Sequence, residues 1–225
     1  MNATSGSNGP NAAFLFGGSR GARFPYGRAA FVGKRATDKE KVMIYELKDC
    51  RTGGKAIYDT TVEISEQGGE LCFRFVCAHT SHYCPYDGYN KIHAEGDTCE
   101  ILIGSDPARK TYYELQLNPN GDRMLAKMVN KGVDERGVPM LDIHFVDEKD
   151  CFLRGKTTLT EDGGYIAEMR LDKTPVGLEG EKIYFNAYRL ETDGGEMDKH
   201  LFALNPTMRP KFHAPDYFVL LEDYV

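Results

Sequence analysis

Apolar side chains recur at every second position over many short segments, and this alternation limits the folds that the chain can adopt. In residues 71–77, Leu71, Phe73 and Phe75 stand on one side of an extended chain, and the residues between them stand on the other. The same period recurs at 98–103, 112–117 and 183–188. A period of two is typical of a strand that buries one face, so these four segments are expected to be strands.

Eight further segments have the composition of strands. They are 41–47, 56–64, 124–130, 141–146, 152–158, 164–171, 201–204 and 217–221. Turn-forming residues separate them, as at 118–121, 161–164 and 193–195. Since no segment shows a long helical period, the sequence predicts an all-β protein, an antiparallel β-sandwich of jelly-roll-like form.

The chain divides into a leader and one domain. Residues 1–39 are expected to be a flexible leader and lead-in, because the first 23 are rich in Gly, Ser and Asn and offer only Phe14–Phe16 for burial. Residues 40–225 contain all the predicted strands and no linker or repeat, so they are expected to form one β-sandwich domain.

Charge and hydropathy exclude two classes of partner. The 28 Lys and Arg against 34 Asp and Glu give a net charge of −6, which argues against nucleic-acid binding by phosphate neutralisation. No stretch approaches the roughly 20 apolar residues of a membrane span, and no signal-peptide core is visible. We therefore expect a cytoplasmic protein with six reduced cysteines, or an extracellular one if a leader has been trimmed, a case that the sequon at Asn2 would suit.

Two patterns raise the question of a bound metal. Five Cys and His residues fall within thirteen positions, namely Cys72, Cys77, His79, His82 and Cys84. They lack the paired spacing of a structural zinc site, so buried cysteines with loop histidines are the favoured interpretation. The spacing of Met and His singles out no haem ligands. Loops at 193–196 and 161–162 offer hard oxygens, so structural calcium is retained as a hypothesis, with no cofactor required.

Acidic residues on neighbouring strands leave a glycoside hydrolase open as an alternative. Asp97, Glu100 and Glu114 could lie close together, as paired catalytic carboxylates do. Acidic residues on a solvated sheet face are much commoner than such pairs, and the chain has no Gly-x-Ser-x-Gly motif.

Tyrosines gather in one loop of a chain that has no Trp. Residues 83–90 place Tyr83, Tyr86 and Tyr89 beside turn formers. An exposed tyrosine has an apolar face and a polar hydroxyl, which suits an amphipathic ligand such as a sugar, although it also suits packing over a sheet edge.

Five motifs in serial order resemble the family 9 carbohydrate-binding modules and their family 9-like relatives. They are the Gly-Asp-x-x-Glu strand at 96–100, the Tyr-x-Glu strand and Asn-Pro-x-Gly turn at 112–121, Gly-Tyr-x-x-Glu at 164–168, Asn-x-x-Arg at 186–189, and Phe-His-x-Pro-x-x-Phe at 212–218. This resemblance covers residues 40–225. It implies a β-sandwich that binds sugars without cleaving them.

The resemblance also implies site residues. Glu100 matches a glutamate that hydrogen-bonds the sugar in that family, and Phe212 matches one of two aromatic residues that clamp it. Two positions depart from the pattern, since the second clamp residue falls at Ala94 and an arginine of the family falls at Gln116. Glutamine lacks the charged fork of arginine, and alanine cannot stack on a sugar ring.

Internal roles compete with ligand contact on these strands. Alternation places Glu100 and Gln116 on the face opposite the apolar residues of their strands, which favours ligand contact. It places Arg189 on the face of Phe185 and Ala187, so Arg189 either meets ligand or pairs internally with Glu168 or Asp97.

Non-catalytic binding of a mono- or oligosaccharide is the function that we predict from these observations. The predicted ligand-binding residues are Glu100, Gln116, Phe212, His213, Tyr86, Tyr89, His93, Asn186 and Arg189, with Tyr86, Tyr89 or His93 supplying the second stacking face. A sandwich without a sugar site that acts as a protein-interaction module is the alternative, and Ala94, Gln116 and the absence of Trp favour it.

Overall fold

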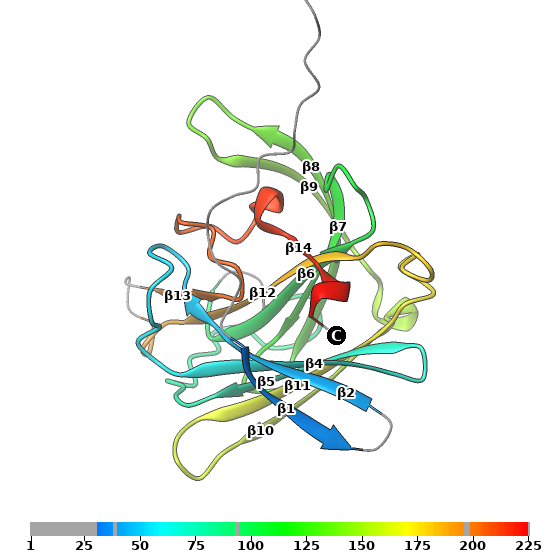
Figure 1. The fold of residues 1–225 in the computed structure, drawn as a ribbon. Coiled ribbons are helices and arrows are strands. Elements are labelled where there is room, and N and C mark those ends of the chain that lie inside the picture. Colours follow the sequence, from blue (N-terminus) through cyan, green and yellow to red (C-terminus); the bar gives the residue numbers. More distant parts are fainter. Residues whose placement is uncertain (1–30, 38–39, 93–94, 196–198, 225) are drawn as a thin grey trace, which may run out of the picture.

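Two antiparallel sheets make up the fold (Figure 1). The computed structural model describes residues 31–37, 40–92, 95–195 and 199–224, with side chains from residue 42 onward. The first sheet has the order β1 (Phe31–Thr37), β2 (Glu40–Glu46), β4 (Thr60–Gln67), β5 (Glu70–Cys77), β11 (Tyr165–Asp172) and β10 (Leu153–Leu159). The chain is therefore an all-β sandwich, as the sequence predicts.

The second sheet has more strands than the first, eight against six. Its order is β3 (Lys48–Asp49), β13 (His200–Ala203), β12 (Tyr184–Glu191), β6 (Thr98–Gly104), β7 (Thr111–Leu117), β8 (Arg123–Val133) and β9 (Pro139–Phe145), and β14 (Val219–Leu220) pairs with β12. The only helices in the described residues are the 3₁₀ turns Glu148–Asp150, Pro215–Tyr217 and Leu221–Asp223. None of these is long and apolar enough to cross a membrane.

The main core lies between the sheets and follows from the alternation. Every second residue of β5, beginning with Leu71, is buried, while the residues between are half-buried. Ile101 and Leu115 face them from the second sheet. Phe73 of β5 and Phe185 of β12 meet across the interface with ring centroids 6.1 Å apart.

A second apolar cluster lies on the other face of the second sheet. It contains Leu102, Tyr112 and Tyr188 from β6, β7 and β12, together with Phe218 from the C-terminal segment, residues 204–224. That segment crosses this face after β13, which is why all seven residues of β6 are buried (Figure 1). The covered face supplies the walls of the candidate site.

Strand boundaries agree with most of the predictions. The strand expected at 56–64 begins later, at Thr60, because residues 50–59 form a loop. The strand expected at 217–221 is reduced to two residues between 3₁₀ turns. The short strand β3 was not predicted. The strand β1, which pairs with β2, lies inside the segment expected to be leader and lead-in, so strand structure begins before residue 40. Residues 1–30 lie outside the described residues.

Candidate functional site

Three polar side chains point from the centre of the second sheet into one pocket. Glu100 on β6 lies opposite Gln116 on β7, and Glu114 precedes Gln116 by one period of the strand. At most 4% of each residue is exposed. Alternation places all three on the face away from the main core, as predicted for Glu100 and Gln116.

The pocket has a volume of about 330 Å³, and we call it the polar pocket. The C-terminal segment and two loops complete its walls. Its lining residues are Arg51, Glu100, Glu114, Gln116, Leu190, Lys199, Leu201, Pro210, Lys211, Phe212 and His213. Four predicted site residues, Glu100, Gln116, Phe212 and His213, thus come together.

One hydrogen-bond acceptor of this pocket is unused. Gln116 donates from Nε2 to Oε1 of Glu114 over 2.7 Å. Its own Oε1 is buried and accepts no hydrogen bond within the described structure. A buried polar atom without a partner is costly, so this oxygen is suited to accept a hydrogen bond from a ligand hydroxyl.

Burial raises the pKa of both carboxyl groups. Desolvation raises the pKa of Glu100 well above its ordinary value, and the neighbouring Glu114 raises it further, while Lys199 opposes the shift. Desolvation also raises the pKa of Glu114 to about 7, against the lowering effect of the Gln116 hydrogen bond. A protonated carboxyl both donates and accepts, which matches the hydrogen bonding of a hydroxyl group.

Phe212 and the imidazole of His213 form the wall that the C-terminal segment contributes. The ring of Phe212 stacks on Tyr188 with centroids 4.4 Å apart. His213 shares a hydrogen bond of 3.0 Å between its Nδ1 and the hydroxyl of Tyr112, and its Nε2 lies 3.6 Å from Oε2 of Glu114. Burial lowers the pKa of His213 to about 4, so its ring is neutral at neutral pH.

Two predicted site residues, Asn186 and Arg189, form hydrogen bonds with other residues of the protein and do not line the polar pocket. Asn186 donates from Nδ2 to the hydroxyl of Tyr188 and to the carbonyl of Asn205, each over 2.8 Å. Its Oδ1 accepts from the backbone of Asn205 over 3.0 Å. Asn186 therefore ties the C-terminal segment to β12 and does not line the polar pocket.

Arg189 lies within the main sandwich and is fully buried. It donates to Glu191 over 2.7 Å, to Thr60 over 2.7 Å, and to the carbonyl of His79. The prediction of an internal pair with Glu168 or Asp97 is wrong, because Glu191 is two residues along the same strand and shares the face of Arg189.

The loop tyrosines lie apart from the polar pocket. Tyr86 is 47% exposed, and its hydroxyl donates to Glu95 over 3.0 Å. Tyr89 packs against the main core, with the guanidinium of Arg123 5.9 Å from its ring. Neither lines the pocket, and His93 and Ala94 lie outside the described residues.

Several lining residues were missed in the sequence. Arg51, Lys199 and Lys211 come from three segments that only the tertiary fold brings together, so no local pattern indicates them. Glu114 is not among the predicted ligand-binding residues, although its position two residues before Gln116 places it on the same strand face.

The Cys and His cluster of the sequence does not assemble. Cys77 faces the other sheet, with its Sγ 3.7 Å from Sγ of Cys99, and His82 pairs with Asn120. Among the described residues, one group of three could hold a metal ion, and it contains His79, Glu191 and Asp193 without a cysteine. Asp193 already accepts from Tyr58 over 3.0 Å and lies 2.8 Å from Nε2 of His200.

Comparisons with known proteins bear on the fold. No family model and no curated protein matches the sequence. Among solved structures, a candidate carbohydrate-binding protein from Bacteroides uniformis ATCC 8492 superposes with a TM-score of 0.59 and 15% identity, over 79% of this chain and 84% of that one. This chain shares the β-sandwich fold of that protein.

Two further structures are family 9 carbohydrate-binding modules from Caldicellulosiruptor kristjanssonii. One is a complex with cellotriose, with a TM-score of 0.44 and 12% identity over 71% of each chain. The other is a complex with glucose, with a TM-score of 0.43 and 12% identity over 85% of this chain and 82% of that one.

Proposed function

We propose that this chain binds carbohydrate in the polar pocket without cleaving it. The observation that carries the proposal is the buried, unpaired Oε1 of Gln116 beside two carboxyl groups and an aromatic ring. Small-molecule sites combine an apolar surface with a few oriented polar groups, and a sugar presents hydroxyls at its rim and C–H groups on its faces. The shared β-sandwich fold agrees with this function but does not carry it.

Each wall of the pocket has a distinct role in this proposal. The carboxyl group of Glu100 and the free oxygen of Gln116 hydrogen-bond the sugar hydroxyls. Phe212 offers ring surface not covered by Tyr188 to the apolar face of the sugar. The departure at Gln116 removes a fixed positive charge but leaves a neutral acceptor, which a neutral sugar can use.

A binding titration tests the proposal. Thermal shifts against a panel of mono- and oligosaccharides choose the ligand, and calorimetry then gives its affinity. We expect Phe212→Ala and Glu100→Ala each to weaken binding by about 1 to 3 kcal/mol while the domain stays folded. Leu159→Ala and Glu161→Ala are matched controls at exposed positions at the end of β10 and in the turn after it, and we expect both to bind as the unchanged protein does.

The alternatives are outcomes of the same experiment. Binding of no sugar would contradict the proposal and favour a protein-interaction module, for which Ile143 and Phe145 on edge strand β9 offer exposed apolar side chains. Release of a sugar product that disappears in Glu100→Gln or Glu114→Gln would favour a hydrolase. The calcium hypothesis stays a prediction, which thermal melts with calcium and with a chelator test.

A further inference from the structure

A second pocket adjoins the polar pocket. Its volume is about 460 Å³, and it shares Lys211 and His213 with the polar pocket. Five of its sixteen lining residues are basic, and we call it the basic pocket. These residues are Arg109, Lys110, Lys131, Arg209 and Lys211, whereas Asp216 is the single acidic residue that lines it. The whole chain has a net charge of −6, so this concentration of positive charge is local.

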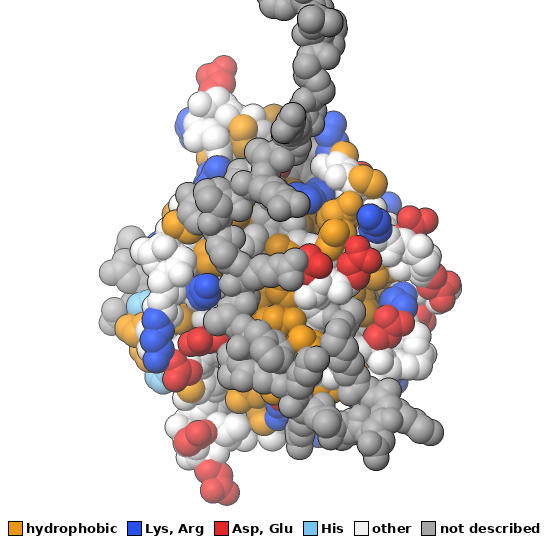
Figure 2. Space-filling view, in the orientation of Figure 1, with side chains coloured by type: hydrophobic (Ala, Val, Ile, Leu, Met, Phe, Trp, Pro, Cys, Tyr) orange, Lys and Arg blue, Asp and Glu red, His pale blue; other side chains and the backbone are white. Residues whose placement is uncertain are grey.

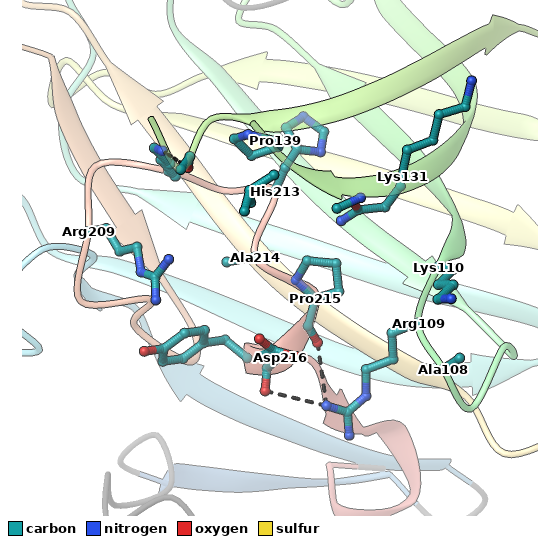
Figure 3. A pocket seen from close by; sticks show the side chains of 16 residues that line it. Ala108, Arg109, Lys110, Lys131, Pro139, Arg209, His213, Ala214, Pro215 and Asp216 are labelled. Carbon is teal, nitrogen blue, oxygen red and sulfur yellow. Dashed lines mark hydrogen bonds between the residues drawn. The ribbon is translucent and has the colours of Figure 1, made fainter. Parts of the chain in front are cut away.

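Most of these cations are not neutralised by carboxylates. Arg109 donates to the backbone carbonyls of Pro215 and Asp216 over 3.4 and 3.3 Å, and Lys211 donates to the carbonyl of Gly137 over 2.6 Å. A carbonyl orients a cation but leaves its charge uncompensated. Arg209 makes no side-chain ion pair or hydrogen bond within the described structure, and Figure 3 shows it across the segment Ala214–Asp216 from Arg109.

The neighbouring acidic groups are already engaged. Lys131 pairs with Asp142 over 2.5 Å, and Asp134 pairs with Arg136 over 3.0 Å. Asp106, beside Lys110, accepts backbone N–H groups of its own turn. Figure 2 shows both basic and acidic side chains scattered over the face that it draws. The basic pocket therefore has an excess of positive charge that an anion would relieve.

We propose that the basic pocket binds the anionic substituent of an acidic oligosaccharide whose neutral part lies in the polar pocket. This inference rests on the proposed function. Lys211 and His213 line both pockets, so one ligand can extend from one to the other. A carboxylate or a sulfate group matches the planar donor fork of arginine and the point charge of lysine.

The two pockets differ in their balance of charge. The polar pocket is lined by the carboxyl groups of Glu100 and Glu114 together with the basic residues Arg51, Lys199 and Lys211. The basic pocket is lined by five basic residues against the single carboxylate of Asp216, which is exposed. This larger excess of positive charge favours the anionic substituent in the basic pocket.

Calorimetry with three oligosaccharides of equal length tests the inference. One is neutral, one carries a uronic acid, and one carries a sulfate ester. We expect at least one acidic ligand to bind about tenfold tighter than the neutral ligand at low salt, because its anionic group accepts charge-assisted hydrogen bonds from arginine and lysine. Added salt is expected to reduce this preference.

Single substitutions test whether the preference for an acidic ligand arises in the basic pocket. Arg209→Gln and Lys110→Gln remove positive charge from residues that line only the basic pocket, so we expect each to reduce the preference for the acidic ligand severalfold. Lys156→Gln, an exposed lysine on β10, is the control and is expected to keep the full preference. Melting temperatures confirm that each variant is folded.

The outcomes separate this inference from the proposed function. Equal affinity for acidic and neutral ligands would overturn the inference and leave the proposed function standing. A preference that survives both Arg209→Gln and Lys110→Gln would also overturn it, because the anion would then bind elsewhere. Binding of no oligosaccharide of either kind would overturn both.

Discussion

Phe212 stacks on Tyr188 with ring centroids 4.4 Å apart and planes inclined by 24°. Tyr188 is fully buried, and its hydroxyl accepts a hydrogen bond of 2.8 Å from Asn186. The phenyl ring on the wall of the polar pocket is thus held from behind by a second ring, which is itself held by a buried amide. This arrangement orders the side chain before a ligand arrives, and ordering in advance reduces the entropic cost of binding.

Substitutions at Tyr188 separate the ring from its hydroxyl. Tyr188→Phe keeps the stacking surface, so we expect a loss of about 1 kcal/mol of unfolding free energy and little loss of sugar affinity. Tyr188→Leu removes the stacked ring, so we expect it to weaken binding by about 1 kcal/mol or more, as Phe212→Ala does. Urea denaturation and calorimetry measure the two quantities. Equal affinities in both Tyr188 variants would show that the stacking does not position Phe212.

Gly96 fixes the loop that precedes β6. Its φ is +134°, and a Cβ there would lie 2.7 Å from the carbonyl oxygen of Tyr83. The next residue, Asp97, accepts from the hydroxyls of Thr80, Ser81 and Thr192. The Gly-Asp pair of the sequence motif is therefore a structural anchor that joins this loop to the end of β12.

Gly96→Ala is expected to cost about 1 to 3 kcal/mol of unfolding free energy, because the backbone conformation of Gly96 and the carbonyl of Tyr83 both oppose a Cβ. Gly121→Ala is the matched control, since Gly121 also has a positive φ, +88°, but no atom within 4 Å of the added Cβ. Urea denaturation of both variants measures the difference. A Gly96 variant no less stable than the Gly121 variant would contradict the steric argument.

The alternation of residues along the strands predicts the side chains at the centre of the site, but not the loops that surround them. It places Glu100 and Gln116 on the outer face of the second sheet because successive side chains of any strand alternate, whatever the tertiary fold. The same rule places Arg189 in the main core, where only the structure identifies Glu191 as its partner. The local sequence therefore predicts which face of the sheet each of these side chains occupies, and the structure agrees with that prediction.

The remainder of the site depends on contacts between distant segments. Lys199 precedes β13 in the sequence and Lys211 follows it, and both line the polar pocket. Arg51, from a third segment, donates to the carbonyl of Lys199 over 3.0 Å. The fully buried faces of β6 likewise depend on the C-terminal segment that covers them. The positions of these loops depend on tertiary packing, which the alternation of residues within a strand does not predict.

The ion pair of Arg189 and Glu191 predicts a test of stability. Arg189→Met leaves the buried Glu191 carboxylate without its partner, so we expect a loss of about 3 to 5 kcal/mol of unfolding free energy. Arg136→Met breaks the Arg136–Asp134 pair, whose arginine is 83% exposed, and is expected to cost less than about 1 kcal/mol. A small loss in Arg189→Met, combined with a large loss of sugar affinity, would instead favour ligand contact by Arg189.

The buried carboxyl groups predict how stability changes with pH. Because the pKa values of Glu100 and Glu114 are raised in the folded state, the folded protein holds protons that the unfolded chain releases above about pH 4.5. Their contribution to stability is therefore present in acid and is lost as the pH rises through the folded pKa values. His213 acts in the opposite sense, since its lowered pKa destabilises the folded state as the pH falls below about 6.5.

Glu100→Gln isolates the contribution of one carboxyl group, because it keeps the shape of the side chain and cannot ionise. We expect this variant to be more stable than the unchanged protein at about pH 8, by about 1 to 3 kcal/mol, and the difference to vanish near pH 4. Glu161→Gln, at an exposed turn, is expected to show no such dependence. Urea denaturation across this range measures both. If Glu100→Gln were the less stable protein at about pH 8, Glu100 would be an ionised partner of Lys199 and not a buried acid.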